Sequence, residues 1–236
     1  MCVGILFTLY GCTPTPLSPP RGAHLPGDGY NVAIILVDTL RPDHLGCYGY
    51  GRARTPAIDF LASEGVLFEN AYTASTFTGE AVASLFTGRP PAMNSTGLGW
   101  TARPTPQESN LPKLLESAGY KTGIFSSSFV MRFRGFYDSF QEAELLPGVE
   151  ITTELEERVT DAALDFAKRH RDEATFQYLH YYAPHAPYNP PATALEPFGP
   201  NREILDPTEE QHPLDLVGQG MLPEEARLTE LKRHYD

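Results

Sequence analysis

Three side chains combine chemically useful groups with positions at the ends of expected strands or helices. Asp38 follows an apolar run, Thr78 lies at or just before the first turn of an expected helix, and His185 lies between two prolines after another apolar run. A carboxylate, a hydroxyl and an imidazole can bind a cation, attack an electrophile and transfer a proton. Each also has a structural interpretation: Asp38 as a turn former, Thr78 as a helix cap, and His185 as a packing residue.

The runs that precede these residues predict how they are positioned. Val32–Val37 is apolar and rich in β-branched residues, which predicts a central parallel strand buried on both faces. Residues 176–182 predict a further strand, within which His180 is interpreted as a supporting or structural residue, and residues 81–86 predict a helix ended by a glycine. Because ligands gather outside the carboxyl ends of parallel strands, Asp38, Thr78 and His185 are expected to converge at that edge.

The rest of the chain alternates between helix and strand patterns. Helices are expected over residues 55–65, 107–118, 150–170 and 223–235, and strands over 66–68 and 121–127. The charged residues of the 150–170 helix are interpreted as a solvated face. This order predicts an α/β fold with a doubly wound, mostly parallel sheet and helices on both faces.

Composition narrows the class of partner. The chain has 236 residues, 41% hydrophobic residues and a formal net charge of −12, which suits one large α/β domain or two small ones and disfavours nucleic acid as a partner. No internal apolar run reaches the length of a membrane span. The three cysteines show neither a disulfide framework nor a zinc site, and Cys47 is expected to be a buried, inert thiol.

Residues 1–29 are expected to form a leader and a tether. An apolar run over residues 3–11 ends at Cys12, as in a bacterial lipoprotein signal peptide, and a Pro/Thr/Ser-rich segment follows over residues 13–20. On this interpretation Cys12 carries a lipid anchor, and the protein is a lipoprotein of the cell envelope or periplasm. The absence of a basic segment before the run and the presence of Tyr10 leave chance similarity as the alternative.

Six motifs occur in the order in which they occur in the sulfatase family of the alkaline-phosphatase superfamily, and the chain resembles that family over residues 30–236. They are NVAIILVDTLRPDHLGCYG at 31–49, TP at 55–56, GVLFENAY at 65–72, ASLFTG at 83–88, LLESAGYKT at 114–122 and PHAPY at 184–188. The resemblance implies an alkaline-phosphatase-like domain over residues 30–236 that is incomplete at its C-terminus. In the family the chain continues into a strand that ends in Ser-Asp-His-Gly and completes the metal site.

The resemblance also implies roles for the three side chains. Asp38 matches the family's metal ligand, Thr78 occupies the position of the nucleophile and of a second metal ligand, and His185 matches the histidine that contacts the ester or leaving group. The metal is usually calcium in sulfatases, with Mg²⁺, Mn²⁺ or Zn²⁺ as alternatives. The implied enzyme hydrolyses sulfate or phosphate esters of small molecules, glycans or lipids.

Five positions depart from the family pattern. Sulfatases have a second Asp where this chain has Thr39, an Arg at Val82, and a Lys-x-His at Ser127 and Phe129. They also have Cys or Ser, oxidised to formylglycine, where this chain has a threonine, which as a secondary alcohol cannot form that aldehyde. Threonine there is the pattern of phosphoryl-transferring relatives. A phosphotransferase-like hydrolase is therefore favoured, and a non-catalytic sulfatase-like binding protein or an inactive fragment is the alternative.

Overall fold

The described part of the chain is built on a mostly parallel sheet. The computed structural model describes residues 3–8, 30–52, 54–94, 110–128, 130–131, 136–146 and 152–185. Among these residues the strand order is β1 (Val3–Thr8), β2 (Val32–Val37), β5 (Thr175–Tyr181), β3 (Lys121–Ser126) and β4 (Glu142–Leu145). Strands β2, β5, β3 and β4 run parallel, and β1 pairs antiparallel with β2.

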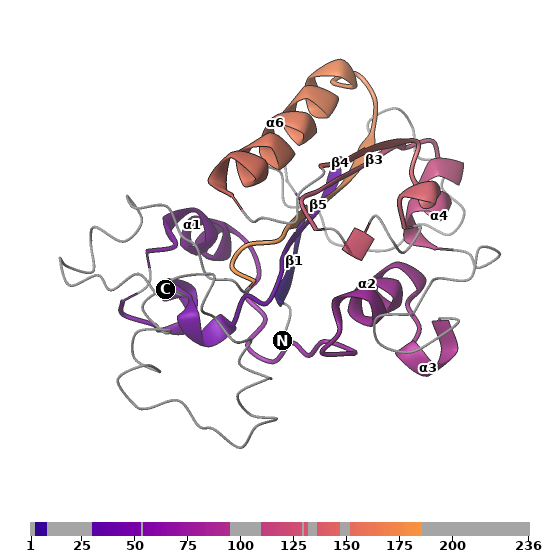
Figure 1. Cartoon of the computed structure of the whole chain (residues 1–236). Coiled ribbons are helices and arrows are strands. Elements are labelled where there is room, and N and C mark those ends of the chain that lie inside the picture. Colours follow the sequence, from indigo (N-terminus) through magenta and orange to yellow (C-terminus); the bar gives the residue numbers. More distant parts are fainter. Residues whose placement is uncertain are drawn as a thin grey trace, which may run out of the picture.

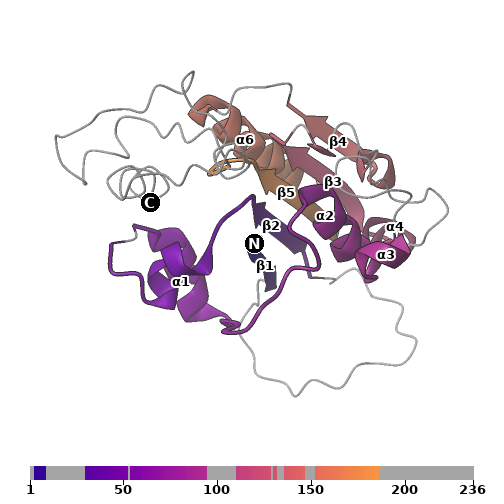
Figure 2. The same ribbon diagram turned by 60° about the horizontal axis from the view of Figure 1, so that its bottom comes forward.

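Helices cover both faces of this sheet. The α-helices of the described residues are α1 (Pro56–Glu64), α2 (Thr78–Thr87), α3 (Pro91–Asn94), α4 (Leu111–Ser117) and α6 (Thr153–Arg169), with short 3-10 turns η1 (Pro42–His44), η2 (Gly46–Tyr48) and η4 (Phe136–Ser139). Helix α6 lies on one side of the sheet, and α2 and α4 lie on the other (Figure 1). Figure 2 shows α1 set away from these covering helices. The doubly wound α/β fold expected from the sequence is confirmed.

The core forms two layers because successive side chains of a strand point to opposite faces. Under α2 and α4 the buried residues include Ile34, Leu36, Val82, Phe86, Ile124, Phe176 and Tyr178. Under α6 they include Phe125, Leu155, Val159, Ala163, Phe166 and Leu179. The ring of Phe86 lies 4.9 Å from that of Tyr178, edge to face, and this contact seats α2 on β5.

Three local expectations are corrected by the structure. Residues 66–68 form no strand: Val66 and Phe68 are 77% and 63% exposed, and no neighbouring strand pairs with them in the described chain. Strand β2 is fully buried on one face only, at Ile34 and Leu36, while the other face is half-buried. Cys47, expected from the sequence to be buried, is only half-buried.

Other expectations fall on residues that the structure does not describe. These are the lipid-anchor cysteine Cys12, the tether over residues 13–20, Phe129, and the helix expected over residues 223–235. The apolar residues at the amino terminus appear as β1, so the leader over residues 1–29 stays a prediction. In the described parts of the chain, no helix combines the length and apolar character that a membrane span requires.

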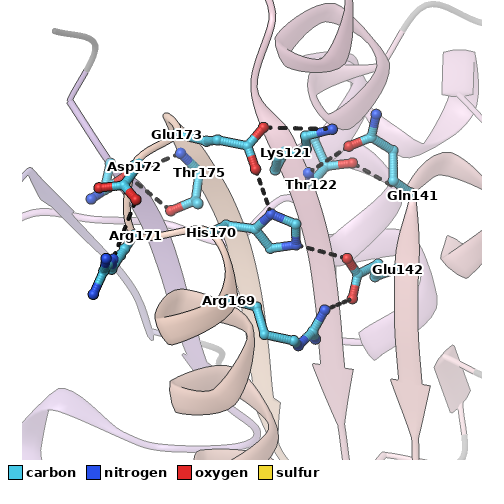
Figure 3. Close-up of polar contacts among 11 residues, drawn as sticks. Lys121, Thr122, Gln141, Glu142, Arg169, His170, Arg171, Asp172, Glu173 and Thr175 are labelled. Atoms are coloured by element: carbon cyan, nitrogen blue, oxygen red, sulfur yellow. Dashed lines mark hydrogen bonds and ion pairs between the residues drawn. The ribbon is translucent and has the colours of Figure 1, made fainter. Parts of the chain in front are cut away.

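A polar cluster fixes the C-terminal end of α6 (Figure 3). The imidazole of His170 lies between Glu142 of β4 and Glu173, with its two ring nitrogens 2.8 Å from a carboxylate oxygen of each. Arg169 donates to the same Glu142 at 2.8 Å, and Lys121 of β3 lies 3.6 Å from Glu173. The cluster therefore ties the helix to two strands of the sheet.

Candidate active site

Asp38 stands directly at the carboxyl end of β2. Its amide donates to the carbonyl of Tyr181 at 2.9 Å, which extends the β2–β5 pairing by one residue. Its side chain is turned inward, and the residue is only 1% exposed. The next residue, Thr39, has a φ of +57°, a left-handed conformation that is costly for a β-branched residue. The strand thus ends in a strained turn beside a buried carboxylate.

Thr78 is the first residue of α2, and its hydroxyl contacts Asp38. The Oγ1 atom lies 3.3 Å from Oδ1 and 3.2 Å from Oδ2 of that carboxylate. The residue in the N-cap position is Phe77, and no side chain caps the helix from there. The hydroxyl of Thr78 is therefore directed at the acid and does not serve as a helix cap.

The entry to α2 is held by two other polar residues. Ser75 donates its hydroxyl to Glu80 at 2.6 Å and accepts the amide of Phe77 at 3.1 Å. Glu80 is only 7% exposed, although it lies in the first turn of the helix. Ser75 and Glu80 therefore stabilise the start of α2, which the side chain of Thr78 does not cap.

His180 lies against Asp38 from the neighbouring strand. Its Nε2 is 3.5 Å from Oδ2 of Asp38, and its Nδ1 is 3.0 Å from the hydroxyl of Tyr178, with both aromatic residues fully buried on β5. When the tyrosine hydroxyl donates to Nδ1, the ring proton lies on Nε2 and faces the carboxylate. The period-two spacing of the tyrosine and the histidine places them on the face that carries Asp38.

The charge of Asp38 is stabilised by its neighbours. Burial raises the pKa of this carboxyl, but the hydrogen bond and charge of His180, the charge of His185 and the hydroxyl of Thr78 outweigh burial and lower the pKa below its usual value. Asp38 is consequently ionised at neutral pH. A carboxylate in this state can bind a cation and accept a hydrogen bond, but it is a weak base.

His185 stands on a turn that follows β5. Its amide donates to the carbonyl of Tyr182 at 2.9 Å, and its ring stacks on that of Tyr182, with centroids 4.5 Å apart. Burial and the charge of Asp38 raise the pKa of Tyr182 to about 12, so this phenol stays neutral. The charge of His185 is among the causes that lower the pKa of the Asp38 carboxyl.

Glu156 of α6 joins this turn, which corrects the interpretation of the helix's charged residues as a solvated face. Its Oε1 accepts the amides of Tyr182 at 3.2 Å and Ala183 at 3.1 Å, and its Oε2 accepts the hydroxyl of Ser127 at 2.9 Å. Burial raises its pKa, and these hydrogen bonds and the charge of His180 only partly offset that effect. Because Glu156 lies three residues before the inward-facing Val159, helical spacing alone indicates the buried side.

Two of the positions expected to depart from the family pattern have structural roles here. Ser127, in place of the family's lysine, is 1% exposed, and it donates to Glu156 while accepting the amide of Tyr182 at 2.9 Å. Val82, in place of the arginine, is fully buried in the core under α2. Neither side chain is placed to bind a substrate.

Asp38 and Thr78 together offer oxygen atoms that suit a hard divalent cation. Carboxylate and hydroxyl oxygens are the donors that Ca²⁺ and Mg²⁺ prefer. The donors converge, since Thr78 Oγ1 lies within 3.3 Å of both carboxylate oxygens. No cluster of three or more His, Cys, Asp or Glu ligands occurs within the described residues. These two residues therefore fit one side of a metal site.

Comparisons with known proteins agree with this fold. The sequence model of the family described as Sulfatase matches residues 30–211. Over 64 residues the chain is 47% identical to iduronate 2-sulfatase of Mus musculus, covering 27% of this chain and 11% of that protein. Over 106 residues it is 36% identical to N-acetylgalactosamine-6-sulfatase of Homo sapiens, covering 40% of this chain and 20% of that protein. The chain thus spans about a fifth or less of the length of these curated relatives.

A solved structure gives the same fold at low sequence identity. It is described as a complex with its substrate, D-glucosamine-2-N,6-O-disulfate, and it superposes with a TM-score of 0.62 at 22% identity, covering 71% of this chain and 37% of that one. The phosphonate monoester hydrolase of Agrobacterium radiobacter superposes with a TM-score of 0.54 at 19% identity, covering 68% and 42%.

Proposed function

Because the chain belongs to the sulfatase family, we propose that it carries the nucleophile and one side of the metal site of a metal-dependent ester hydrolase, with phosphate esters preferred over sulfate esters. The observation that carries this proposal is the contact between the Thr78 hydroxyl and the ionised, buried Asp38. A hydroxyl that served only the helix would bond to a backbone amide of its first turn.

The chemistry divides into two steps on residues of this chain. Thr78 Oγ1 attacks phosphorus, the ester oxygen departs with a proton from His185, and the hydroxyl proton of Thr78 passes to solvent. Water then attacks the phosphorus of the phosphothreonine and gives a proton to His185. The Oγ1–P bond breaks, phosphate is released, and Thr78 Oγ1 takes a proton from solvent. The amides at the start of α2 add positive partial charge where the phosphoryl oxygens gather.

A divalent cation would be held by Asp38 and Thr78. When bound it would lower the pKa of the hydroxyl and neutralise charge on the transferred group. The role of Asp38 is then to supply negative charge at a fixed position. His180 Nε2 lies 3.5 Å from that carboxylate, and the hydroxyl of Tyr178, 3.0 Å from His180 Nδ1, holds the imidazole in this orientation.

The choice of phosphate over sulfate rests on the side chain at position 78. Formylglycine forms from a primary Cys or Ser side chain, whereas Thr78 is a secondary alcohol. A threonine hydroxyl can attack phosphorus directly. The named activity of the phosphonate monoester hydrolase, whose fold is similar, shows that this architecture also accommodates phosphorus chemistry.

A second function is favoured by different residues. Ser127 and Val82 stand where the resemblance implies groups that bind sulfate and support the nucleophile, and both are committed to the interior. A sulfatase-like protein that binds an ester without cleaving it would explain these changes. Turnover separates the two functions, because a binding protein shows saturable binding of ester but releases no product.

The test compares p-nitrophenyl phosphate, bis-p-nitrophenyl phosphate and p-nitrophenyl sulfate with the purified protein and added Ca²⁺, Mg²⁺, Mn²⁺ or Zn²⁺. We expect a higher kcat/KM for a phosphate ester than for the sulfate, and a gain of phosphate mass on the Thr78 peptide after acid quenching. Faster cleavage of the sulfate ester would overturn the preference. Phosphate cleavage with no dependence on Thr78 would overturn the mechanism.

A location at the cell envelope is a separate part of the proposal. It rests on the lipoprotein-like run that ends at Cys12. The intact mass of the protein isolated from the membrane fraction tests this location, because processing of a lipoprotein signal would leave a lipid-modified chain that begins at Cys12. A chain that retains residues 3–8 would instead agree with their pairing to β2.

A further inference from the structure

The carboxylate of Glu156 is the meeting point of three chain segments. It accepts the hydroxyl of Ser127 just after β3, and it accepts the amides of Tyr182 and Ala183 just after β5. All three partners belong to the carboxyl edge of the sheet, whereas Glu156 itself comes from the helix that covers one face.

The contacts of Glu156 lead directly to His185. Tyr182, whose amide Glu156 accepts, receives the amide of His185 at its carbonyl and stacks its ring on the imidazole at 4.5 Å. Ala183 is the other amide held by the same oxygen, two residues before His185. The position of the His185 imidazole therefore depends on a short segment in which the amides of Tyr182 and Ala183 donate to the Glu156 carboxylate.

Helix α6 gives Glu156 a fixed base. Leu155 and Val159 on either side of it are buried in the core under the helix. The helix begins at a capped end, where the side chain of Thr152 accepts the amide of Leu155 at 3.2 Å. Because α6 is fixed at this point, the Glu156 carboxylate has little freedom to follow the turn after β5 if that turn moves.

We infer that Glu156 is a positioning residue, which holds the turn of Tyr182, Ala183 and His185 so that the imidazole faces the reacting ester. This inference rests on the proposed function, because it assigns Glu156 a role through the proton transfer of His185. Glu156 does not touch the ester or the metal. Its loss should act as a partial loss of His185, which changes the dependence of the rate on the leaving group.

The first test measures the turn itself. Glu156→Met keeps the length of the side chain and removes the acceptor, Glu156→Gln keeps one oxygen acceptor, and Glu157→Met changes an exposed neighbour on the same helix. By amide hydrogen exchange we expect faster exchange at residues 182, 183 and 185 in Glu156→Met, with near-normal exchange in Glu156→Gln and Glu157→Met. Unchanged protection of the turn in Glu156→Met would overturn the inference.

The second test measures the leaving group. Phenol departs less readily than p-nitrophenol, so phenyl phosphate needs the proton from His185 more than p-nitrophenyl phosphate does. We expect His185→Ala and Glu156→Met to lower kcat/KM for phenyl phosphate more than for p-nitrophenyl phosphate, by a factor of about ten or more. Glu156→Gln should recover most of the kcat/KM that Glu156→Met loses on phenyl phosphate, and Glu157→Met should behave as the unchanged protein on both esters.

The outcomes separate the inference from the proposed function. If His185→Ala discriminates between the two esters and Glu156→Met does not, the positioning role is wrong and the proposed function stands. If His185→Ala fails to discriminate, the proposed role of His185 is wrong, and the exchange experiment alone decides whether Glu156 holds the turn. Equal losses of kcat/KM for both esters in Glu156→Met, with faster amide exchange throughout the protein, would mean that Glu156 contributes only to overall stability and would overturn the inference.

Discussion

The hydroxyl of Thr78 lies 3.2 Å from Oδ2 of Asp38, although the two residues are 40 positions apart in the sequence. The contact joins the end of β2 to the first turn of α2. It forms because β2 ends and α2 begins at the carboxyl edge of the sheet, where ligands of such folds gather. The threonine hydroxyl therefore contacts the acid and does not cap α2.

Substitutions at Thr78 separate nucleophilic from structural roles. Thr78→Ser keeps a hydroxyl and should retain measurable turnover, while Thr78→Ala and Thr78→Asn should lose it by a factor of about 10³ or more if Thr78 is the nucleophile. Thr78→Asn keeps a polar group that can serve a helix terminus. Steady-state kinetics on the preferred ester measures these losses, and full activity of Thr78→Asn would mean that Thr78 is structural.

Removal of the Asp38 charge should weaken metal binding. We expect Asp38→Asn to reduce affinity for Ca²⁺, Mg²⁺ or Mn²⁺ by about tenfold or more, because even groups that only support metal ligands are worth about 10- to 100-fold. Calorimetric titration measures the change. Asp43→Asn is the matched control, since this exposed acid bonds to the side chain of Arg41 beside the same strand end.

Residues 1–236 should bind Ca²⁺, Mg²⁺ or Mn²⁺ weakly. Among the residues that the structure describes, Asp38 and Thr78 supply ligand oxygens on one side of the metal site, and no cluster of three or more His, Cys, Asp or Glu side chains adds to them. Chelation with EDTA should abolish turnover, and added divalent ions should restore it. Tight, stoichiometric binding that survives Asp38→Asn would place the metal elsewhere.

Gly123→Ala should destabilise the fold. A Cβ atom at Gly123 of β3 would lie 2.9 Å from the ring of Phe125 and 3.1 Å from that of Phe166, between the sheet and α6. Overpacking of this kind costs about 1–3 kcal/mol in the free energy of unfolding. Gly51→Ala is the control, because its Cβ would meet no atom within 4 Å. Urea unfolding compares the two, and equal stabilities would show that the two rings move aside freely.

The His170 cluster should make stability depend on pH. Hydrogen bonds to Glu173 and Glu142 raise the pKa of His170 above its unfolded value of 6.5, so its contribution is complete below that pH and is lost as pH rises through the folded pKa. Burial raises the pKa of Glu142, but hydrogen bonds from His170 and Arg169 outweigh it and lower this pKa below 4.5. The hydrogen bond from His170 and the charge of Lys121 likewise lower the pKa of Glu173 below 4.5. The contribution of both glutamates is complete above 4.5 and is lost as pH falls through their folded pKa. The cluster therefore stabilises most between about pH 4.5 and 6.5.

The measurement is urea unfolding of His170→Gln at pH 5.5 and 8.5. We expect a larger loss of stability at pH 5.5, with a smaller loss at pH 8.5 that reflects the packing of the imidazole on Phe166, whose ring centroid is 4.6 Å away. High salt should reduce the difference, because the carboxylates are partly exposed. Arg171→Gln, which removes an exposed pair with Asp172, should show no such pH dependence. Equal losses at both pH values would contradict the ionic origin.

The sequence by itself determined the family, the main strands and the helices under which the core forms. Apolar runs such as Val32–Val37 and the period of α6 encode local structure directly, because each element must bury its own apolar face. The ends of these elements marked Asp38, Thr78 and His185 as candidates, since chain topology fixes which ends share an edge of the sheet.

Only the tertiary structure decided what each polar side chain contacts. Whether the Thr78 hydroxyl caps its helix or bonds to Asp38 depends on the distance between two elements, which local sequence does not contain. The same holds for His180 and Glu156, whose residue types are common on solvated or structural positions and whose roles follow from the strand ends that they reach. Hydrogen-bond partners distant in sequence are fixed by packing, because a buried polar group must find its partner wherever the fold places one.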